Sequence, residues 1–284
     1  MSTIPFCKFH GFGNDYIVIE RVNIPESGPL SDLAVAICHR NTGVGSDGIA
    51  VIEKISDDDA DFFCEIVNPD GSVAGFSGNG TRCAVSHLYY KDLWQRPDLR
   101  LKTRSGVKKY HLIESVSEGS YLFEAEIGQP EFASNRIPVE REHSEVVIDN
   151  EIDVNGRIFL FSAINVGNPV ACIFVDDFDF DWRTYGKAME THPLFPERAN
   201  IVFVRVIDKE YIELRIWERG AGETSASGTC SSGAAVLSAF TGKTGRQVFV
   251  LSPGGTTKVD WREDGEILLT GRADLAFCGE WPVD

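Results

Sequence analysis

Two pairs of short segments rich in Gly and Asn recur in the same order in the two halves of the chain. Gly13-Asn14 precedes an apolar stretch, and Gly167-Asn168 precedes another. The segment Ser77-Gly78-Asn79-Gly80-Thr81 opens an Ala- and Val-bearing stretch, as Ser227-Gly228-Thr229-Cys230-Ser231 does. Both pairs are separated by roughly 150 residues, and a shared offset of this kind indicates an internal duplication. We therefore expect two similar lobes, with a ligand site in the cleft between them.

The local patterns predict a mixture of strands and helices. Stretches rich in β-branched and aromatic residues predict strands over residues 16–20, 121–127, 157–166, 200–208, 211–217 and 248–251. Helices are expected from a Ser31-Asp32 cap to Arg40, after Ser77, over residues 182–191, and after Ser227. This mixture is typical of an α+β fold.

The length of 284 residues exceeds that of a usual single domain. We expect an N-terminal lobe over residues 1–133, completed by residues 268–284, and a C-terminal lobe over residues 134–267. The boundary is placed between residues 129 and 150, where charged and polar residues interrupt the pattern: Glu140, Arg141, Glu142, His143, Ser144 and Glu145.

Charge and cysteine usage exclude several classes of function. The 27 basic residues against 43 acidic ones give a net charge of −16, which opposes nucleic-acid binding. No apolar run approaches the roughly 20 residues of a membrane span, and no secretory leader is apparent. The 7 cysteines are odd in number and scattered without a CxxC pair, and the 6 histidines show no metal-ligand spacing. We therefore expect a soluble cytoplasmic protein without disulfides or a bound metal.

Ser77 and Ser227 each stand just before an expected helix start. Unpaired N–H groups and the helix dipole attract an anion there, so two such helix ends would hold one carboxylate well. The alternative is that both serines are simply N-caps.

The alternation of residues along the strand at 211–217 draws attention to Glu218. Ile212, Leu214 and Ile216 share one face of the strand, and Glu218 continues that apolar row. A carboxylate in this position is costly unless it is partnered or catalytic. The alternative is that the strand ends at Trp217 and leaves Glu218 in solvent.

Four asparagines, Asn14, Asn68, Asn168 and Asn200, lie beside turns or strand ends. Their amides offer donors and acceptors to an amino-acid ligand. Asparagine is also common in turns for local reasons, and a turn role is the favoured interpretation of each of them taken singly.

A series of ordered motifs covers nearly the whole chain. They are Phe9-His10-Gly11-Phe12-Gly13-Asn14-Asp15-Tyr16, Gly43-Val44-Gly45-Ser46-Asp47-Gly48, Asn68-Pro69-Asp70-Gly71-Ser72, Ser77-Gly78-Asn79-Gly80-Thr81-Arg82-Cys83, Val166-Gly167-Asn168-Pro169, Arg198-Ala199-Asn200, Trp217-Glu218-Arg219-Gly220-Ala221-Gly222, Ser227-Gly228-Thr229 and Thr270-Gly271-Arg272-Ala273. Together these stretches resemble the diaminopimelate epimerase family. The resemblance implies two pseudo-symmetric lobes, each a mixed sheet wrapped around a central helix.

The resemblance also implies an amino-acid isomerase that needs no cofactor and converts LL- to meso-diaminopimelate, a precursor of lysine and the cell wall. In that family two cysteines flank the α-carbon of the substrate, one removing the proton and the other returning it. Ser77 and Ser227 stand at those two positions, with Glu218 as the acid kept beside Ser227. A thiol with a pKa of about 8.5 can cycle near neutral pH, whereas an alcohol needs strong activation.

A second departure is Val170, since the Gly-Asn-Pro motif of the family is normally followed by a histidine that activates one cysteine. Deliberate Cys→Ser substitution would not require Val170, so natural divergence is the favoured explanation of the serines. Cys83 and Cys230 lie too far along their helices to replace the missing thiols without rearrangement.

Residues that hold the substrate in the family are better preserved. Those expected to bind substrate here are Asn14, Asn68, Gly78, Asn79, Asn168, Asn200, Arg219, Gly228 and Thr229, of which Gly78, Asn79, Gly228 and Thr229 match the cradle for the reacting carboxylate. The expected ligand is a small amino acid similar to diaminopimelate, and a homodimer is one option for the assembly.

Three hypotheses follow. The chain is an epimerase that works through activated hydroxyls, or an isomerase or lyase in which Glu218 is the single base and Ser227 orients it. The third is a divergent paralogue that binds an amino acid without epimerising it.

Overall fold

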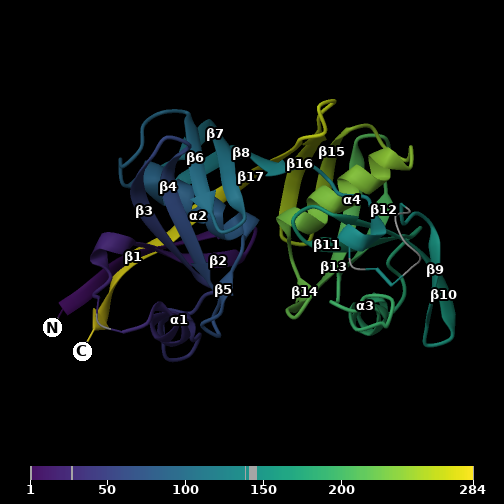
Figure 1. Cartoon of the computed structure of the whole chain (residues 1–284), viewed down its shortest axis with the longest axis horizontal. Helices are drawn as coiled ribbons and strands as arrows, with labels where there is room; N and C mark the ends of the chain where they lie inside the picture. The colour runs from purple at the N-terminus through teal and green to yellow at the C-terminus, as the bar shows by residue number, and fades with distance from the viewer. Residues whose placement is uncertain (1, 27, 138, 141–145, 284) are drawn as a thin grey trace. The chain divides into compact units, whose positions relative to one another are not determined.

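The computed structural model describes residues 2–26, 28–137, 139–140 and 146–283. The chain divides into two compact units (Figure 1). Unit 1 comprises Met1–Ala125 and Thr270–Asp284, and unit 2 comprises Glu126–Leu269. The first division falls within strand β8 (Ser120–Gly128), earlier than the expected position after residue 133, and the return falls within β17 (Ile267–Val283). The predicted boundary residues Arg141, Glu142, His143, Ser144 and Glu145 lie outside the described residues.

Unit 1 contains strands in both parallel and antiparallel pairs, together with α-helices. Its elements are β1 (Ser2–Gly11), β2 (Asn14–Glu20), the short η1 (Arg21–Asn23), α1 (Leu30–Cys38), β3 (Ile49–Asp57), β4 (Ala60–Val67), β5 (Val73–Ala74), α2 (Gly78–Tyr90), β6 (Asp98–Thr103), β7 (Gly106–Ser117), β8 and the larger part of β17.

Unit 2 repeats this order. Its elements are η2 (Ser134–Arg136), β9 (Asn150–Val154), β10 (Arg157–Asn165), β11 (Pro169–Phe174), α3 (Trp182–Glu190), β12 (Asn200–Val206), β13 (Tyr211–Glu218), β14 (Gly222–Thr224), α4 (Gly228–Phe240), β15 (Gln247–Ser252), β16 (Gly255–Trp261) and the start of β17. All of the strands predicted from the sequence are present, with ends that differ by a few residues.

The pairing of strands shows that the two units share one topology. In unit 1, β1–β2 is antiparallel, β2–β3 parallel, β3–β4 antiparallel and β4–β6 parallel. In unit 2, β10–β11, β11–β12, β12–β13 and β13–β15 repeat this series of directions. The α+β fold class and the pair of similar lobes are therefore confirmed.

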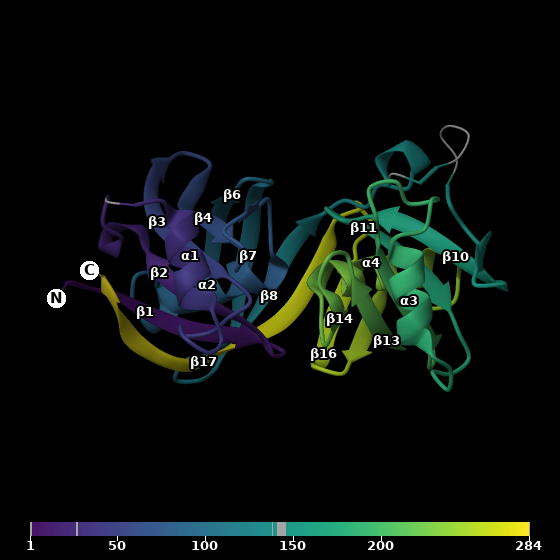
Figure 2. The same cartoon turned by 90° about the horizontal axis from the view of Figure 1, so that it is seen from below.

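Each unit is built around one enclosed helix. Residues 79–88 of α2 and residues 229–238 of α4 are all buried, and Figures 1 and 2 show α2 among the strands of unit 1. Small residues allow this close enclosure, because a Cβ on Gly80 would meet the ring of Tyr16 at 2.9 Å. In α4, a Cβ on Gly233 would meet Val170 at 3.1 Å.

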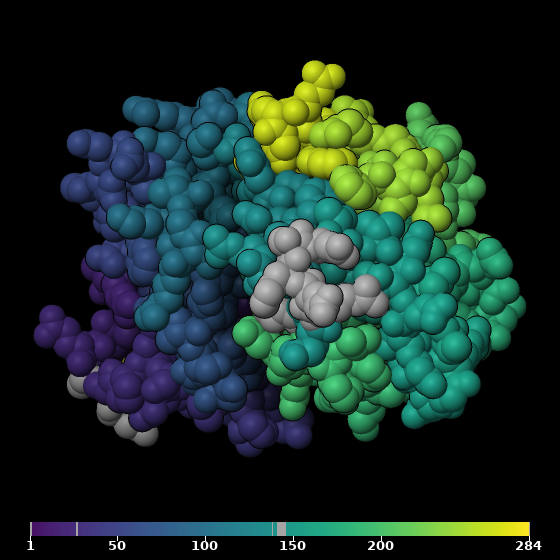
Figure 3. All heavy atoms as spheres, turned by 45° about the vertical axis from the view of Figure 1, so that its right-hand side comes forward, coloured from purple at the N-terminus to yellow at the C-terminus, as the bar shows by residue number. Residues whose placement is uncertain are grey.

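Each unit also has an apolar core that includes residues of a second helix, α1 in unit 1 and α3 in unit 2. In unit 1, Ala34, Ile37 and Cys38 of α1 join a cluster with β1 to β4, and in unit 2, Trp182 and Met189 of α3 join a larger one. The β9–β10 hairpin forms part of the outer surface of unit 2 (Figure 3). Within the described residues, no helix is long and apolar enough to cross a membrane.

The predicted limits of α1 are wrong at both ends. The helix begins at Leu30 with Pro29 as N-cap, and the Ser31 hydroxyl donates to the Asp32 carboxylate instead of capping. The helix ends at Cys38 because the chain turns back, so that the N–H groups of Val44 and Gly45 donate to the Ile37 carbonyl. Such long-range caps are not visible in the local sequence.

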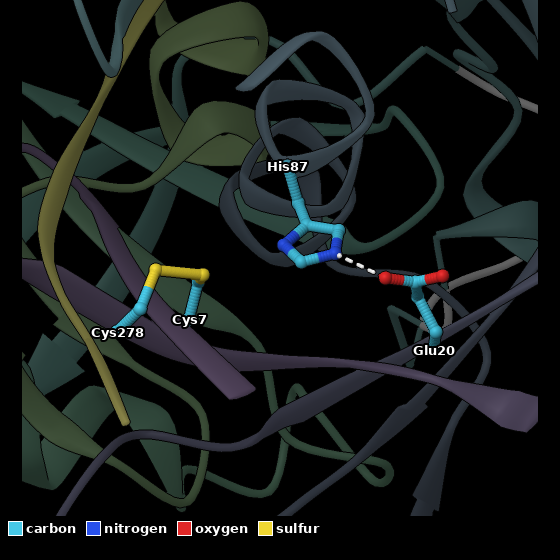
Figure 4. The surroundings of a disulfide bond; sticks show 4 residues. All are labelled: Cys7, Glu20, His87 and Cys278. Atoms are coloured by element: carbon cyan, nitrogen blue, oxygen red, sulfur yellow. Dashed lines mark hydrogen bonds and ion pairs between the residues drawn. A yellow bond between two sulfur atoms is a disulfide. The ribbon is translucent and has the colours of Figure 1, made fainter. Parts of the chain in front are cut away.

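The expectation that disulfides are absent is also wrong. Cys7 of β1 and Cys278 of β17 face each other in an antiparallel pair and form a disulfide (Figure 4). Their 271-residue separation in sequence hides this proximity, so the scatter of the cysteines carries no information about redox compartment. The free cysteines among the described residues are all buried: Cys38, Cys64, Cys83, Cys172 and Cys230.

Candidate active site

Ser77 begins α2 in unit 1 and acts as an N-cap. Its Oγ accepts a hydrogen bond from the N–H of Gly80 at 3.1 Å. The same Oγ lies 2.9 Å from the hydroxyl of Tyr16, and the two share a hydrogen bond. The Tyr16 ring is buried against Gly48 and Gly80, where a Cβ would approach it within 3 Å. The sequence reasoning missed Tyr16, although it belongs to the motif that contains Asn14.

Four side chains at and beside the start of α2 form a continuous chain of hydrogen bonds. Asn79 Nδ2 donates to Asn14 Oδ1 at 3.1 Å, and Asn14 Nδ2 donates to Asp47 Oδ2 at 2.7 Å. Arg82 Nη1 donates to Asn79 Oδ1 at 3.0 Å. Arg82 is only 1% exposed, and burial lowers its pKa. These contacts bring together Asn14 and Asn79, two of the predicted site residues.

Asn68 lies in a turn of unit 1, after β4. Its backbone N–H and its side-chain Nδ2 both donate to Ser72, and Gly71 closes the turn at a φ of 83°. These contacts agree with the alternative that Asn68 serves its own turn.

In unit 2, three of the predicted residues converge on one network. Asn200 Oδ1 accepts from the backbone N–H of Arg219 at 3.0 Å, and Asn200 Nδ2 donates to the carbonyl of Pro169 at 2.9 Å. The guanidinium of Arg219 donates to Asn168 Oδ1 at 3.5 Å and to the Glu197 carbonyl at 3.2 Å. The cation of Arg219 is thus held on two sides while remaining exposed.

Glu218 is the last residue of β13, so the alternative that the strand ends at Trp217 is wrong. It pairs with Gly222 across the turn, and its Oε1 accepts from the hydroxyl of Thr224 at 2.8 Å. The apolar row of Ile212, Leu214 and Ile216 is fully buried, while Glu218 is half-buried. The carboxylate therefore lies at the edge of the core of unit 2.

Ser227 begins α4 but, unlike Ser77, makes no side-chain cap. It is buried, its Oγ lies 3.5 Å from that of Thr229, and it hydrogen-bonds the Cys230 sulfur. The Ser227 hydroxyl therefore does not occupy the first N–H groups of α4, which are the groups that attract an anion at a helix start.

The buried thiols near the helix starts are poor bases. Burial raises the pKa of Cys83 to about 12. The pKa of Cys230 is raised by burial first and then by the negative charge of Glu218. Both groups are therefore neutral thiols near pH 7 and do not supply a thiolate.

Val170 is completely buried, and its side chain packs against α4 at Gly233. It pairs with Asn200 in the parallel β11–β12 ladder. The position after Pro169, next to Asn200, is therefore occupied by an apolar side chain packed against α4. Among the described residues, no cluster of three or more His, Cys, Asp or Glu side chains is arranged to hold a metal ion.

Solved structures with the same fold define the structural class. A phenazine biosynthesis protein of the PhzF family from Bacillus anthracis is 17% identical, with a TM-score of 0.69 and full coverage of both chains. A probable proline racemase from Agrobacterium radiobacter is 14% identical, with a TM-score of 0.71 over 99% of this chain and 93% of that one. The chain therefore has the two-lobed fold that these proteins share.

Sequence comparisons give the family within this class. The family model for diaminopimelate epimerase matches residues 6–132 and 162–276. Curated diaminopimelate epimerases from Pelotomaculum thermopropionicum and Moorella thermoacetica are 38% and 36% identical over 98% of this chain, covering 98% and 99% of their own lengths. The chain belongs to the diaminopimelate epimerase family.

Proposed function

We propose that the protein is an amino-acid isomerase that moves the α-proton of diaminopimelate or a closely related dicarboxylic amino acid, in the supply of lysine and cell-wall precursors. The observation that carries this proposal is the network of Asn168, Asn200 and Arg219. A guanidinium held by an amide oxygen and a backbone carbonyl is well placed to bind a carboxylate. The curated relatives, named diaminopimelate epimerases over their full length, support the same substrate.

A carboxylate of the substrate would be held at a helix start, and each unit offers one. Gly78 and Asn79 open α2, and Gly228 and Thr229 open α4. N–H groups at such positions, with the positive end of the helix dipole, favour an anion. Asn14 supports this role by fixing the Asn79 side chain.

Proton transfer would have to use oxygen acids. Ser77 has the phenol of Tyr16 as a hydrogen-bond partner, and the ordinary pKa of a phenol is about 10. In unit 2, Glu218 is a half-buried carboxylate that accepts a hydrogen bond from Thr224, and it can act as an acid or base itself, with Ser227 of α4 in the orienting role. If Glu218 is the single base, the enzyme would catalyse isomerisation or elimination on one face of the substrate only.

A second candidate is an amino-acid binding protein without turnover. The buried side chain of Val170 favours it, because an apolar residue that pairs with Asn200 stands where the family motif has a histidine. Keeping the Arg219 network while losing both thiols is the pattern expected of a silent paralogue.

Deuterium uptake at the α-carbon in heavy water, followed by NMR for LL- and meso-diaminopimelate and a panel of amino acids, separates these candidates. Exchange with inversion supports an epimerase, and exchange without inversion supports Glu218 as a single base, in which case Glu218→Gln abolishes it. Binding without exchange identifies the silent paralogue. Neither binding nor exchange, under conditions where a cysteine-containing relative exchanges, overturns the proposal.

The variant carrying Ser77→Cys, Ser227→Cys and Val170→His is the matched control for the scaffold. Gain of exchange by this variant would show that the substrate-holding residues are competent. If neither the wild type nor this variant binds diaminopimelate, the substrate-binding residues themselves are not competent.

A further inference from the structure

Glu190 is the last residue of α3 and is only 6% exposed. Its two carboxylate oxygens have separate partners on the β13–β14 hairpin. Oε2 accepts from the indole Nε1 of Trp217 at 2.8 Å, and Oε1 accepts from the backbone N–H of Gly220 at 2.8 Å. A buried carboxylate is expensive unless hydrogen bonds of this kind compensate it.

The two partners of Glu190 lie on either side of Glu218 and Arg219. Strand β13 ends at Glu218, and the chain then turns through Gly220 and Gly222, which have φ angles of 76° and 79°. Glycines in this region leave the turn free to adopt other conformations. The Glu190 side chain therefore holds the turn at its start, through Trp217, and near its apex, through Gly220. We call this pair of hydrogen bonds the clamp.

Helix α3, which carries Glu190, is itself fixed by an N-cap and by close packing against β13. Asp181 caps its N-terminus, and Gly186 allows the helix to approach Trp217 so closely that a Cβ would meet the Trp217 Cβ at 3.0 Å. Arg198 lies 3.5 Å from Oε1 of Glu190 and balances its charge.

We propose that Glu190 is a positioning residue that fixes the hairpin of residues 217–222 and thereby aims Glu218 and Arg219; this inference rests on the proposed function. Both donors are N–H groups, so both oxygens of residue 190 must accept. A glutamine has nearly the same shape, but it offers one acceptor and turns an NH₂ group toward a donor. The reacting groups would then move, and displacements of about 1 Å can cost about 100-fold in rate.

The experiment compares Glu190→Gln with Glu223→Gln. Glu223 joins the same hairpin to the same helix through Arg183, at 2.6 and 2.8 Å, but on the exposed side. We expect Glu190→Gln to lower kcat/KM for α-proton exchange about 10- to 100-fold, or to weaken diaminopimelate binding by about 10-fold if the protein only binds. Glu223→Gln should change either value less than twofold.

Two NMR signals report positioning without activity: the indole Nε1–H of Trp217 and the backbone amide of Gly220. Glu190→Gln should shift both and speed hydrogen exchange at Gly220, while the thermal midpoint stays close to that of Glu223→Gln. Unchanged signals, or activity within twofold of the wild type, would overturn the inference. If the wild type neither binds nor exchanges, the proposed function fails while these signals still test the clamp.

If Glu190→Gln does not fold, Trp217→Phe removes one donor and keeps the aromatic packing. The Gly220 amide should then keep its protection, while affinity or rate falls below that of the wild type. An unaffected rate and affinity in Trp217→Phe would overturn the Trp217 arm of the clamp.

Discussion

Ser77 and Ser227 occupy equivalent helix starts, yet their hydroxyl groups have different partners. Ser77 caps α2 through the N–H of Gly80 and also meets Tyr16. Ser227 leaves its helix uncapped by its side chain and contacts Cys230. Residue type and position are therefore the same in the two units, but the chemistry available to each hydroxyl is not.

This difference predicts unequal effects on stability. Ser77→Ala removes an N-cap and should lower the free energy of unfolding by about 1 kcal/mol. Ser227→Ala removes no cap and should cost less. Urea unfolding followed by circular dichroism measures both; equal losses, or a larger loss for Ser227→Ala, would contradict the assignment of the cap to Ser77 alone.

The raised pKa values of the buried thiols lead to a second residue-level prediction. Because burial raises the pKa of Cys83 to about 12 and that of Cys230 in the same direction, neither group forms a thiolate near neutral pH. We expect iodoacetamide at pH 8 to leave both unmodified in the native protein, as read by peptide mass spectrometry. Modification of either one with parallel loss of exchange would instead make it a substitute for the missing catalytic thiols.

At the scale of elements, the turn between β1 and β2 is held by a buried carboxylate. Asp15 Oδ2 lies 2.7 Å from Lys8 Nζ, and Oδ1 lies 3.0 Å from Arg40 Nη2. Burial alone would raise the pKa of Asp15, but the hydrogen bonds from Arg40 and Lys8 outweigh it and lower the pKa below its ordinary value. These contacts tie the strand pair to the segment that follows α1.

The lowered pKa of Asp15 sets the direction of a pH effect. Its ionised form is favoured by folding, so the stabilisation is complete above the unfolded pKa of about 3.9 and is lost as the pH falls through the folded value. Asp15→Asn should therefore be less stable than the wild type at pH 7, with the difference shrinking below about pH 4. Urea midpoints measured from pH 7 to acid test this; a constant difference would contradict it, and Lys8→Met should remove part of the same dependence.

At the scale of the whole molecule, the Cys7–Cys278 disulfide joins residues near the two ends of the chain. It closes a loop that includes nearly the entire sequence. Cross-links of long loops restrict the unfolded state most.

Reduction should therefore lower the free energy of unfolding by about 2 to 4 kcal/mol. Cys7→Ser combined with Cys278→Ser should reproduce the loss and be insensitive to reductant. Thiol titration of the denatured, unreduced wild type provides the control, because the disulfide removes two of the 7 cysteines. A full count of 7 thiols would show that the bond does not form.

Much of the fold was accessible from local patterns and the internal repeat. The alternation of Ile212, Leu214 and Ile216 predicted the buried face of β13, and the Ser-Gly starts predicted α2 and α4. These features depend on near neighbours in the chain, so the sequence carries them directly. The duplicated order of strands also followed, because the repeat keeps its spacing.

Contacts between distant residues were not accessible in this way. The pairing of Cys7 with Cys278, the hydrogen bond of Tyr16 with Ser77, and the clamp of Glu190 on Trp217 each join separate elements. The sequence by itself determined which side chains stand at strand ends and helix starts. Only the tertiary structure decided which of them meet, because strand register and helix packing bring together groups whose separation in the chain gives no sign of their contact.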